Sequence, residues 1–180
     1  MYSIETARLR LRPFRSTDLD ALAPMQADPD VMRFIGNGQP RDRATSVQTI
    51  ERYIAAWQHG FSMWAVETLD DATFVGRCGL WFLDNTPEVE VGYSFGKAWW
   101  GHGYATEAAR ASVRFGMETA QLPHIAGITY PENVASRRVL EKCDLRYQGM
   151  ATFYGVHATY YTIVRSAWTP DDAPYNLAST

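Results

Sequence analysis

Apolar and polar side chains alternate near the start of the chain, over residues 6–14. A period of two residues is typical of a strand with one buried face. The polar face of this strand would carry Arg8, Arg10 and Arg12. These arginines form either a solvated strand surface or a basic stripe for an acidic partner.

The pattern then changes to helical spacing. Ser16 or Thr17 is expected to cap a short helix, and a proline directly after Asp28 is expected to begin another, because its missing N–H costs nothing in the first turn. From Thr45 to about Gln58 the apolar residues recur on one helical stripe. This first third of the chain is therefore predicted to be mostly helical.

The remaining pattern predicts a sheet with two more helices. Two tight turns separate the first three strands, which implies an antiparallel meander. A turn at 154–157 joins the last two strands as a hairpin. We expect a single domain of the α+β class over residues 1–168, with one mixed sheet and helices on both faces, and a loose C-terminal tail over 169–180. The predicted strands are 62–69, 73–83, 87–95, 124–130, 146–153 and 158–167, and the predicted helices are 103–119 and 133–143.

Composition narrows the class of protein. The 180 residues are 46% hydrophobic and 21% charged, with a net charge of −3, so no global basic field favours nucleic acid as the main partner. Cys78 and Cys143 are too few for a disulfide framework and are expected to be reduced core thiols of a cytoplasmic protein. Arginines interrupt the N-terminal segment, so we expect neither a signal peptide nor a membrane span.

Candidate chemistry begins in the strand at 87–95. Its polar face carries Glu88, Glu90, Gly92 and Ser94. A glycine inside a strand often marks a bulge or the close approach of a ligand. The two carboxylates are either solvated edge charges or candidates for a general base in a cleft.

The segment Trp99–Ala108 joins this strand to a helix through two glycines, Gly101 and Gly103. Amides at such a helix start can hold an anion, and a pyrophosphate is the expected ligand. A dinucleotide-binding fingerprint would need a third glycine where Thr106 stands, and a P-loop lysine is absent. Further along, Asn133 is a helix N-cap with Ser136 three positions later, and Arg137 and Arg138 are surface charges or phosphate contacts.

The order and spacing of four segments resemble the GNAT superfamily of acyl-CoA-dependent N-acyltransferases. More narrowly, they resemble its ribosomal-protein N-terminal acetyltransferase (RimJ/RimL-like) branch. The likeness spans residues 5–167. The segments are TARLRLR at 6–12, EVGY at 90–93, WGHGYATEA at 100–108 and NVASRRVLEK at 133–142. Two departures are Trp100, where many members have Gln or Arg, and Cys143-Asp144-Leu145, which replaces a usual Gly-Phe.

The resemblance implies a strongly bent mixed sheet of about seven strands. This sheet opens between the strands at 88–95 and 124–130 to bind acetyl-CoA. The pantetheine would pair with backbone between Gly92 and Phe95, and the pyrophosphate would meet amides of residues 101–106. The cofactor-binding residues implied are Tyr93, Ser94, Phe95, Gly101, His102, Gly103, Tyr104, Ala105, Thr106, Asn133 and Ser136.

Acetyl transfer to an amine requires a group that takes the amine proton. Glu90 is the expected base, with Glu88 as the second candidate. A backbone N–H of Tyr93 or Ser94 would stabilise the oxyanion. Ser136 would assist the leaving thiolate, with Tyr130 and Tyr104 as alternatives. The histidines His59, His102, His124 and His157 are scattered, so we expect no metal.

The expected acceptor is a protein or peptide N-terminal α-amine. The alternatives are a small-molecule amine, such as an amino acid, polyamine or drug, and a non-catalytic acyl-CoA sensor. Residues 16–60 and the turn at 154–157 would build the acceptor site. No membrane partner is expected, and a homodimer is left open.

Overall fold

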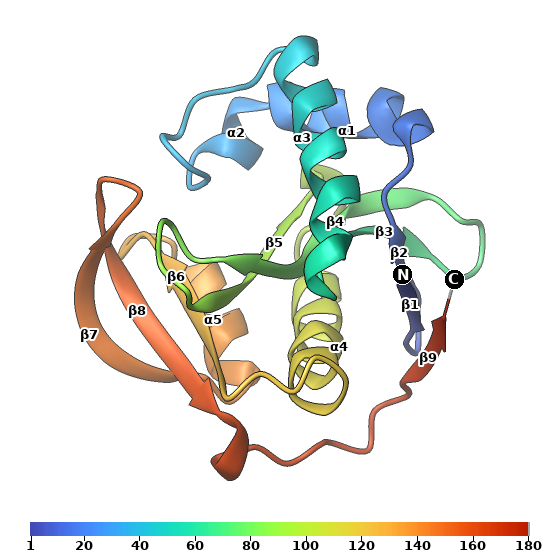
Figure 1. Ribbon diagram of the computed structural model, residues 1–180. Coiled ribbons are helices and arrows are strands. Elements are labelled where there is room, and N and C mark those ends of the chain that lie inside the picture. Colours follow the sequence, from blue (N-terminus) through green and yellow to red (C-terminus); the bar gives the residue numbers. More distant parts are fainter. Residues whose placement is uncertain (180) are drawn as a thin grey trace.

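The alternating segments form one continuous sheet, and the segments with helical spacing cover it (Figure 1). The computed structural model describes residues 1–179. The strands are β1 (Tyr2–Glu5), β2 (Leu9–Pro13), β3 (Met63–Thr68), β4 (Phe74–Phe82), β5 (Val89–Phe95), β6 (His124–Thr129), β7 (Arg146–Phe153), β8 (Val156–Val164) and β9 (Asn176–Ser179). The α-helices are α1 (Leu19–Ala27), α2 (Pro29–Met32), α3 (Arg43–Ala56), α4 (Tyr104–Glu118) and α5 (Val134–Lys142), and 3₁₀ turns lie at Ser16–Asp18, Trp57–His59, Lys97–Trp99 and Arg165–Ala167.

The sheet has the order β7-β8-β6-β5-β4-β3-β2-β1-β9. All neighbouring strands pair antiparallel except β5 and β6, which run parallel. The predicted meander β3-β4-β5 and the mixed α+β class are confirmed. The single parallel junction therefore lies in the middle of the sheet, between two antiparallel blocks.

The sheet has nine strands where about seven were expected. The alternation at 6–14 produces only β2, and a separate strand, β1, precedes it. The tail was expected to be loose, and this was wrong over Asn176–Ser179, because β9 pairs with β1. Figure 1 shows β9 beside β1 at this edge. The pairing satisfies backbone groups of β1 that an edge strand would leave open.

Helix starts differ from the expected caps in two places. A 3₁₀ turn over Ser16–Asp18 leads into α1, so neither expected residue acts as a side-chain cap there. Helix α3 begins two residues earlier than expected, at Arg43, because the side chain of Asp42 accepts a hydrogen bond from the Thr45 amide at 2.7 Å. Asp28 caps α2 as expected, through the amide of Asp30.

Each face of the sheet has its own core. On the α4 face, Leu80 and Val91 pack with Phe115 of the helix. On the α1–α3 face, Met63 packs with Ile50 and other helix residues. Alternate residues of β3 and β4 serve the two cores, so these two strands are covered on both sides.

The turn after α5 accommodates its unusual sequence. Asp144 takes the left-handed conformation, with φ of 62°. Glycine favours this position, and aspartate is among the few other residues that tolerate it. The Leu145 amide donates to the Leu140 carbonyl at 3.1 Å, which closes the helix end. Replacement of the usual Gly-Phe therefore leaves the helix end intact.

The arginines of the predicted stripe are paired with carboxylates. Arg12, for example, contacts two carboxylates and is largely buried. Since these charges are neutralised within the fold, they form neither a simple solvated face nor an open basic stripe. The pairs are Arg8–Glu107, Arg10–Glu5, Arg10–Glu67, Arg12–Asp18 and Arg12–Glu67.

Cys78 and Cys143 are both free thiols in the core. Along residues 1–179, no helix has both the length and the apolar character needed to cross a bilayer.

Candidate active site

The parallel junction opens into a cleft. Strand β5 pairs with β4 over its whole length, from Val89 to Phe95. It pairs with β6 only where Glu90 lies opposite Ala126. Beyond that point the two strands separate, and a cleft of about 950 Å³ occupies the opening. The opening lies between the two strands for which it was expected.

The predicted site residues gather around this cleft, with one exception. His102 is absent from the cleft lining: its ring stacks on Tyr104, and its Nδ1 lies 3.0 Å from the Trp100 carbonyl oxygen. A role for His102 in cofactor binding stays a prediction. The predicted residues that do line the cleft are Glu90, Tyr93, Ser94, Phe95, Gly101, Gly103, Tyr104, Ala105, Thr106, Asn133 and Ser136.

The start of α4 forms one end of the cleft. Gly103 is its N-cap, with φ of 82° and no side chain to satisfy the first amides. Gly101 has φ of 81°, so both glycines occupy a conformation that other residues rarely adopt. Free amides and the helix dipole favour an anion here. Arg138 and Lys142 of α5 line the same cleft and add positive charge.

A brace from the N-terminal segment holds this helix start. The carboxylate of Glu107 accepts hydrogen bonds from the Thr6 hydroxyl at 2.7 Å and from the Arg8 amide and Nε at 2.8 Å each. Arg8 also donates to the His102 carbonyl at 3.0 Å. Glu107 lies in the segment WGHGYATEA. Its partners come from the segment TARLRLR, so two segments of the family resemblance are in direct contact.

Glu90 lies where β5 and β6 part. The Tyr154 hydroxyl donates to its Oε1 at 2.9 Å. Burial raises the pKa of Glu90 to about 7, and the Tyr154 hydrogen bond and the charge of Arg77 oppose that shift. Glu88, the second candidate base, accepts instead from the Tyr160 hydroxyl at 2.7 Å and is not among the residues that line the cleft.

Tyr154 is a site residue that the sequence did not single out, although its turn was expected near the acceptor. It sits at the tip of the β7–β8 hairpin with φ of 50°. Its amide donates to Asp84 Oδ2 at 2.9 Å, and the Asp84 amide donates to its hydroxyl at 2.7 Å. These bonds tie the hairpin to the β4–β5 turn, a contact between segments 70 residues apart that no local pattern indicates.

At the start of α5, Asn133 caps the helix and the Ser136 side chain lies in the cleft lining. Asn133 Oδ1 accepts from the Ser136 amide at 3.1 Å, so the Asn133 side chain is the cap. The Ser136 hydroxyl instead lies 2.9 Å from the Tyr93 hydroxyl, and burial raises the pKa of Tyr93. The two tyrosines named as alternatives also line the cleft, but their side chains have other partners: Tyr130 donates to the Gly36 carbonyl, and the Tyr104 ring lies under the Arg8 guanidinium.

The face of β5 opposite to Val91 and Tyr93 is polar and lines the cleft. Cross-strand partners point to the same side of a sheet, so Glu90, Gly92 and Ser94 share a face with Trp81 and Arg77 of β4. A Cβ at Gly92 would meet nothing nearer than a Met63 side-chain atom at 3.8 Å. Any larger side chain would extend into the cleft, so the glycine keeps its floor open.

No set of three or more His, Cys, Asp or Glu side chains suited to a metal ion occurs within residues 1–179. The polar groups around the cleft are a carboxylate, hydroxyls, arginines and backbone amides.

Comparison with known proteins identifies the fold. The family model described as an acetyltransferase (GNAT) domain matches residues 8–146. The FsC-acetyl coenzyme A-N(2)-transacetylase of Aspergillus fumigatus is 30% identical over 189 residues, covering 92% of this chain and 77% of that protein.

Solved structures agree. A GNAT-family acetyltransferase from Bacillus anthracis superposes with a TM-score of 0.79 at 25% identity, covering 91% of this chain and 99% of that one. RimJ from Mycobacterium smegmatis, in complex with CoA-disulfide, superposes with a TM-score of 0.76 at 20% identity, covering 90% and 87% of the two chains. The chain belongs to the GNAT family and is an acetyl-CoA-dependent N-acetyltransferase.

Proposed function

We propose that this protein acetylates the α-amine of a protein or peptide N-terminus, with Glu90 as the general base. The observation that carries the proposal is the position of Glu90. Its carboxyl lies at the point where β5 and β6 part, in the same cleft as the start of α4, and its pKa is about 7. A carboxyl with that pKa exists in both protonation states at neutral pH, as proton transfer requires.

The cleft fits acetyl-CoA at two places. The amides of residues 101–106 would hold the pyrophosphate, because the first turn of α4 has no side-chain cap. The edge of β5 from Gly92 to Phe95 has no β6 partner, so its backbone can pair with the pantetheine like an added strand. Bound acetyl-CoA supplies the thioester. Asn133 and Ser136 would contact its pantetheine and thiol end.

Each proposed catalytic group has one task. An α-amine has a pKa near ~8 and is mostly protonated at neutral pH, so Glu90 takes the proton that the attacking nitrogen loses. The backbone N–H of Tyr93 or Ser94 faces the developing oxyanion. Ser136 donates a hydrogen bond to the departing thiolate, and Tyr93, 2.9 Å away, orients the Ser136 hydroxyl.

Support for a peptide N-terminus comes from the resemblance to the ribosomal-protein branch and from the shared fold with RimJ. The name of the relative from Aspergillus fumigatus gives FsC as its acceptor, and this supports the second candidate, an amine other than a protein N-terminus. The retained carboxylate and hydroxyl argue against a sensor without catalysis. The cytoplasmic location inferred from the sequence stays a prediction.

The test is a panel of amines assayed for thiol release from acetyl-CoA. It contains peptides with free N-termini, the same peptides with acetylated N-termini, and free amino acids, polyamines and aminoglycosides. We expect turnover with free peptide N-termini and none with blocked ones. Faster turnover of small amines would transfer the proposal to that class. Binding of acetyl-CoA without turnover of any amine would overturn it in favour of a sensor.

A further inference from the structure

Four arginines line the cleft from the α1–α3 side, and three of them, Arg41, Arg52 and Arg77, act on one another electrostatically; the fourth is Arg33. Arg41 precedes α3, Arg52 lies on α3, and Arg77 lies on β4 in register with Ser94. Within residues 1–179 none of the three forms a salt bridge, whereas those of the N-terminal stripe are all paired with carboxylates. Unpaired arginines in a cleft are a common way to bind an anion.

The contacts of these arginines orient them without neutralising them. Arg77 Nε donates to the Ser94 hydroxyl at 2.9 Å, and its Nη1 donates to the Tyr53 hydroxyl at 2.6 Å. Because Tyr53 accepts this bond, its own proton stays available to a ligand. The described side-chain hydrogen bond of Arg41 goes to the Thr49 hydroxyl at 3.4 Å, and the Arg52 guanidinium lies 5.7 Å from the centre of the Trp81 ring.

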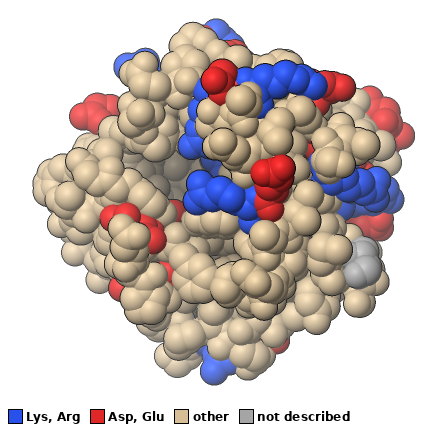
Figure 2. All heavy atoms as spheres, turned by 45° about the horizontal axis from the view of Figure 1, so that its top comes forward, with Lys and Arg blue, Asp and Glu red and all other residues tan. Residues whose placement is uncertain are grey.

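The positive charges act on one another. Burial lowers the pKa of Arg41, and the charges of Arg77 and Arg52 lower it further. Repulsion between cations in a half-buried cleft is unfavourable and is relieved when an anion binds among them. Figure 2 shows Lys and Arg side chains at the edge of a hollow on this face of the molecule.

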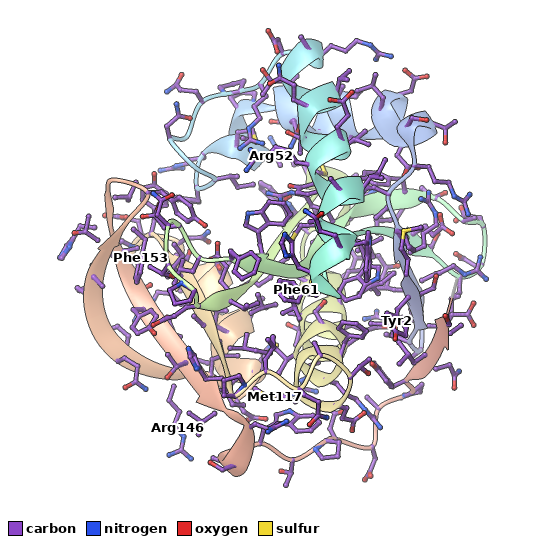
Figure 3. All side chains as sticks on the ribbon, viewed as in Figure 1. Tyr2, Arg52, Phe61, Met117, Arg146 and Phe153 are labelled. Atoms are coloured by element: carbon purple, nitrogen blue, oxygen red, sulfur yellow. The ribbon has the colours of Figure 1, made fainter. Side chains whose placement is uncertain are left out.

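The cluster lies on the acceptor side of the cleft. Arg77, Ser94 and Glu90 share the sheet face that α1–α3 cover, whereas α4 lies on the other face. In Figure 3, Arg52 stands on the α3 side of the cleft and Phe153 on the side of the β7–β8 hairpin, and both line the cleft. The charge of Arg77 also acts on the pKa of Glu90, so the cluster and the base belong to one site.

We infer that Arg41, Arg52 and Arg77 bind a carboxylate of the acceptor, so the protein prefers amines that carry a carboxylate near the reacting nitrogen. This inference rests on the proposed function and adds the substrate class. Planar guanidinium groups match carboxylates through paired N–H donors, and the Tyr53 hydroxyl adds another donor. The carboxylate belongs either to an acidic residue next to a peptide N-terminus or to a small amino acid.

The kinetic test compares each acid with its amide. The substrates are peptides of the form Ser-Asp-Ala-Ala and Ser-Asn-Ala-Ala, both with amidated C-termini, and β-alanine with β-alaninamide. We expect the wild-type protein to prefer the acid of at least one pair by tenfold or more in kcat/KM. A preference in the peptide pair would identify peptides as the acceptor, and a preference in the β-alanine pair would identify amino acids.

The variant Arg52→Gln is expected to reduce this acid-to-amide ratio at least fivefold, and Arg52→Lys to restore part of it. Arg52 is exposed and makes no described hydrogen bond, so its replacement leaves the fold intact. Arg43→Gln is the matched control: it removes the same charge from the same helix, but Arg43 pairs with Asp20 and lies outside the cleft lining. The control is expected to keep the wild-type ratio.

A binding experiment tests the inference without turnover. Glutarate, a dicarboxylate without an amine, is titrated calorimetrically into the complex with CoA. We expect binding that Arg52→Gln weakens and Arg43→Gln does not, with CoA affinity equal in all three proteins. Glutarate binding without thiol release from any amine would overturn only the proposed function. Equal kcat/KM for acids and amides, absence of glutarate binding, or a loss of CoA affinity in Arg52→Gln would each overturn the carboxylate site.

Discussion

The two ends of the cleft are built in different ways. At the α4 end, one continuous segment supplies amides and two glycines in the left-handed conformation, braced by Thr6 and Arg8. At the acceptor end, side chains come from separate elements: the segment before α3, α3 itself, β4, β5 and the β7–β8 hairpin. A site of backbone amides can hold the same ligand in many relatives, whereas a site of side chains can change its ligand by substitution.

The largest expected effect on kcat comes from Glu90, which lies between the two ends of the cleft. Glu90→Gln keeps the size of the side chain and removes the base, so kcat should fall roughly 10²-fold. Glu88→Gln is the control, because Glu88 bonds Tyr160 outside the cleft lining. Steady-state kinetics on both variants decide the matter. Equal losses in the two variants would show that general carboxylate charge matters and that Glu90 has no special position.

The cofactor end is tested by Gly103→Val. A Cβ there would lie 3.5 Å from Nη2 of Arg8, which braces this helix start, and valine adopts the backbone conformation poorly. The affinity for acetyl-CoA should therefore fall at least tenfold, or ~1.4 kcal/mol. Gly60→Val is the strain control, because Gly60 has φ of 85°, open space around it and no place in the cleft lining. Calorimetry on folded protein measures both. Wild-type affinity for acetyl-CoA in Gly103→Val would contradict the assignment of the anion site to this loop.

The pH dependence follows from the pKa of Glu90. The base works when ionised, so the rate should rise roughly fivefold from pH 6 to pH 7 and flatten above the pKa of about 7. Glu90→Gln should lack this component of the profile.

The stability of the protein should also depend on the pKa of Glu90. The folded carboxyl holds its proton more tightly than the unfolded one, whose pKa is 4.5, so the free energy of unfolding should fall as pH rises from 4.5 to about 7. Thermal unfolding of both proteins across this range checks the sign, and an identical pH trend in the variant would contradict it.

The smallest effects separate capping from catalysis on α5. Asn133→Ala removes the cap and should cost about 1 kcal/mol of stability. Ser136→Ala keeps that cap and should instead lower turnover severalfold, since one hydrogen bond contributes ~0.5–1.5 kcal/mol. Melting temperature and kcat are measured on both. Full turnover in Ser136→Ala would leave Tyr93, its hydrogen-bond partner, as the better candidate acid.

Much of the fold follows from local pattern. The meander β3-β4-β5 and the helices α3, α4 and α5 lie close to their expected ranges, because alternation and helical spacing both report burial of one face. The added strands β1 and β9 did not follow. Each has only four residues, and β9 forms because β1 offers it an open edge. A strand of that kind depends on its partner more than on its own residues.

The sequence by itself determined the local structure at the starts of α4 and α5, where we propose that acetyl-CoA binds, because glycines before a helix and a capping asparagine act on backbone within a few residues of themselves. It also placed Glu90, Gly92 and Ser94 on one strand face. Only the tertiary structure decided that Tyr154 reaches Glu90, that Tyr93 meets Ser136, and that Arg41, Arg52 and Arg77 share a cleft. Those contacts join elements distant in the chain, and a contact that depends on how whole elements pack leaves no local pattern to find.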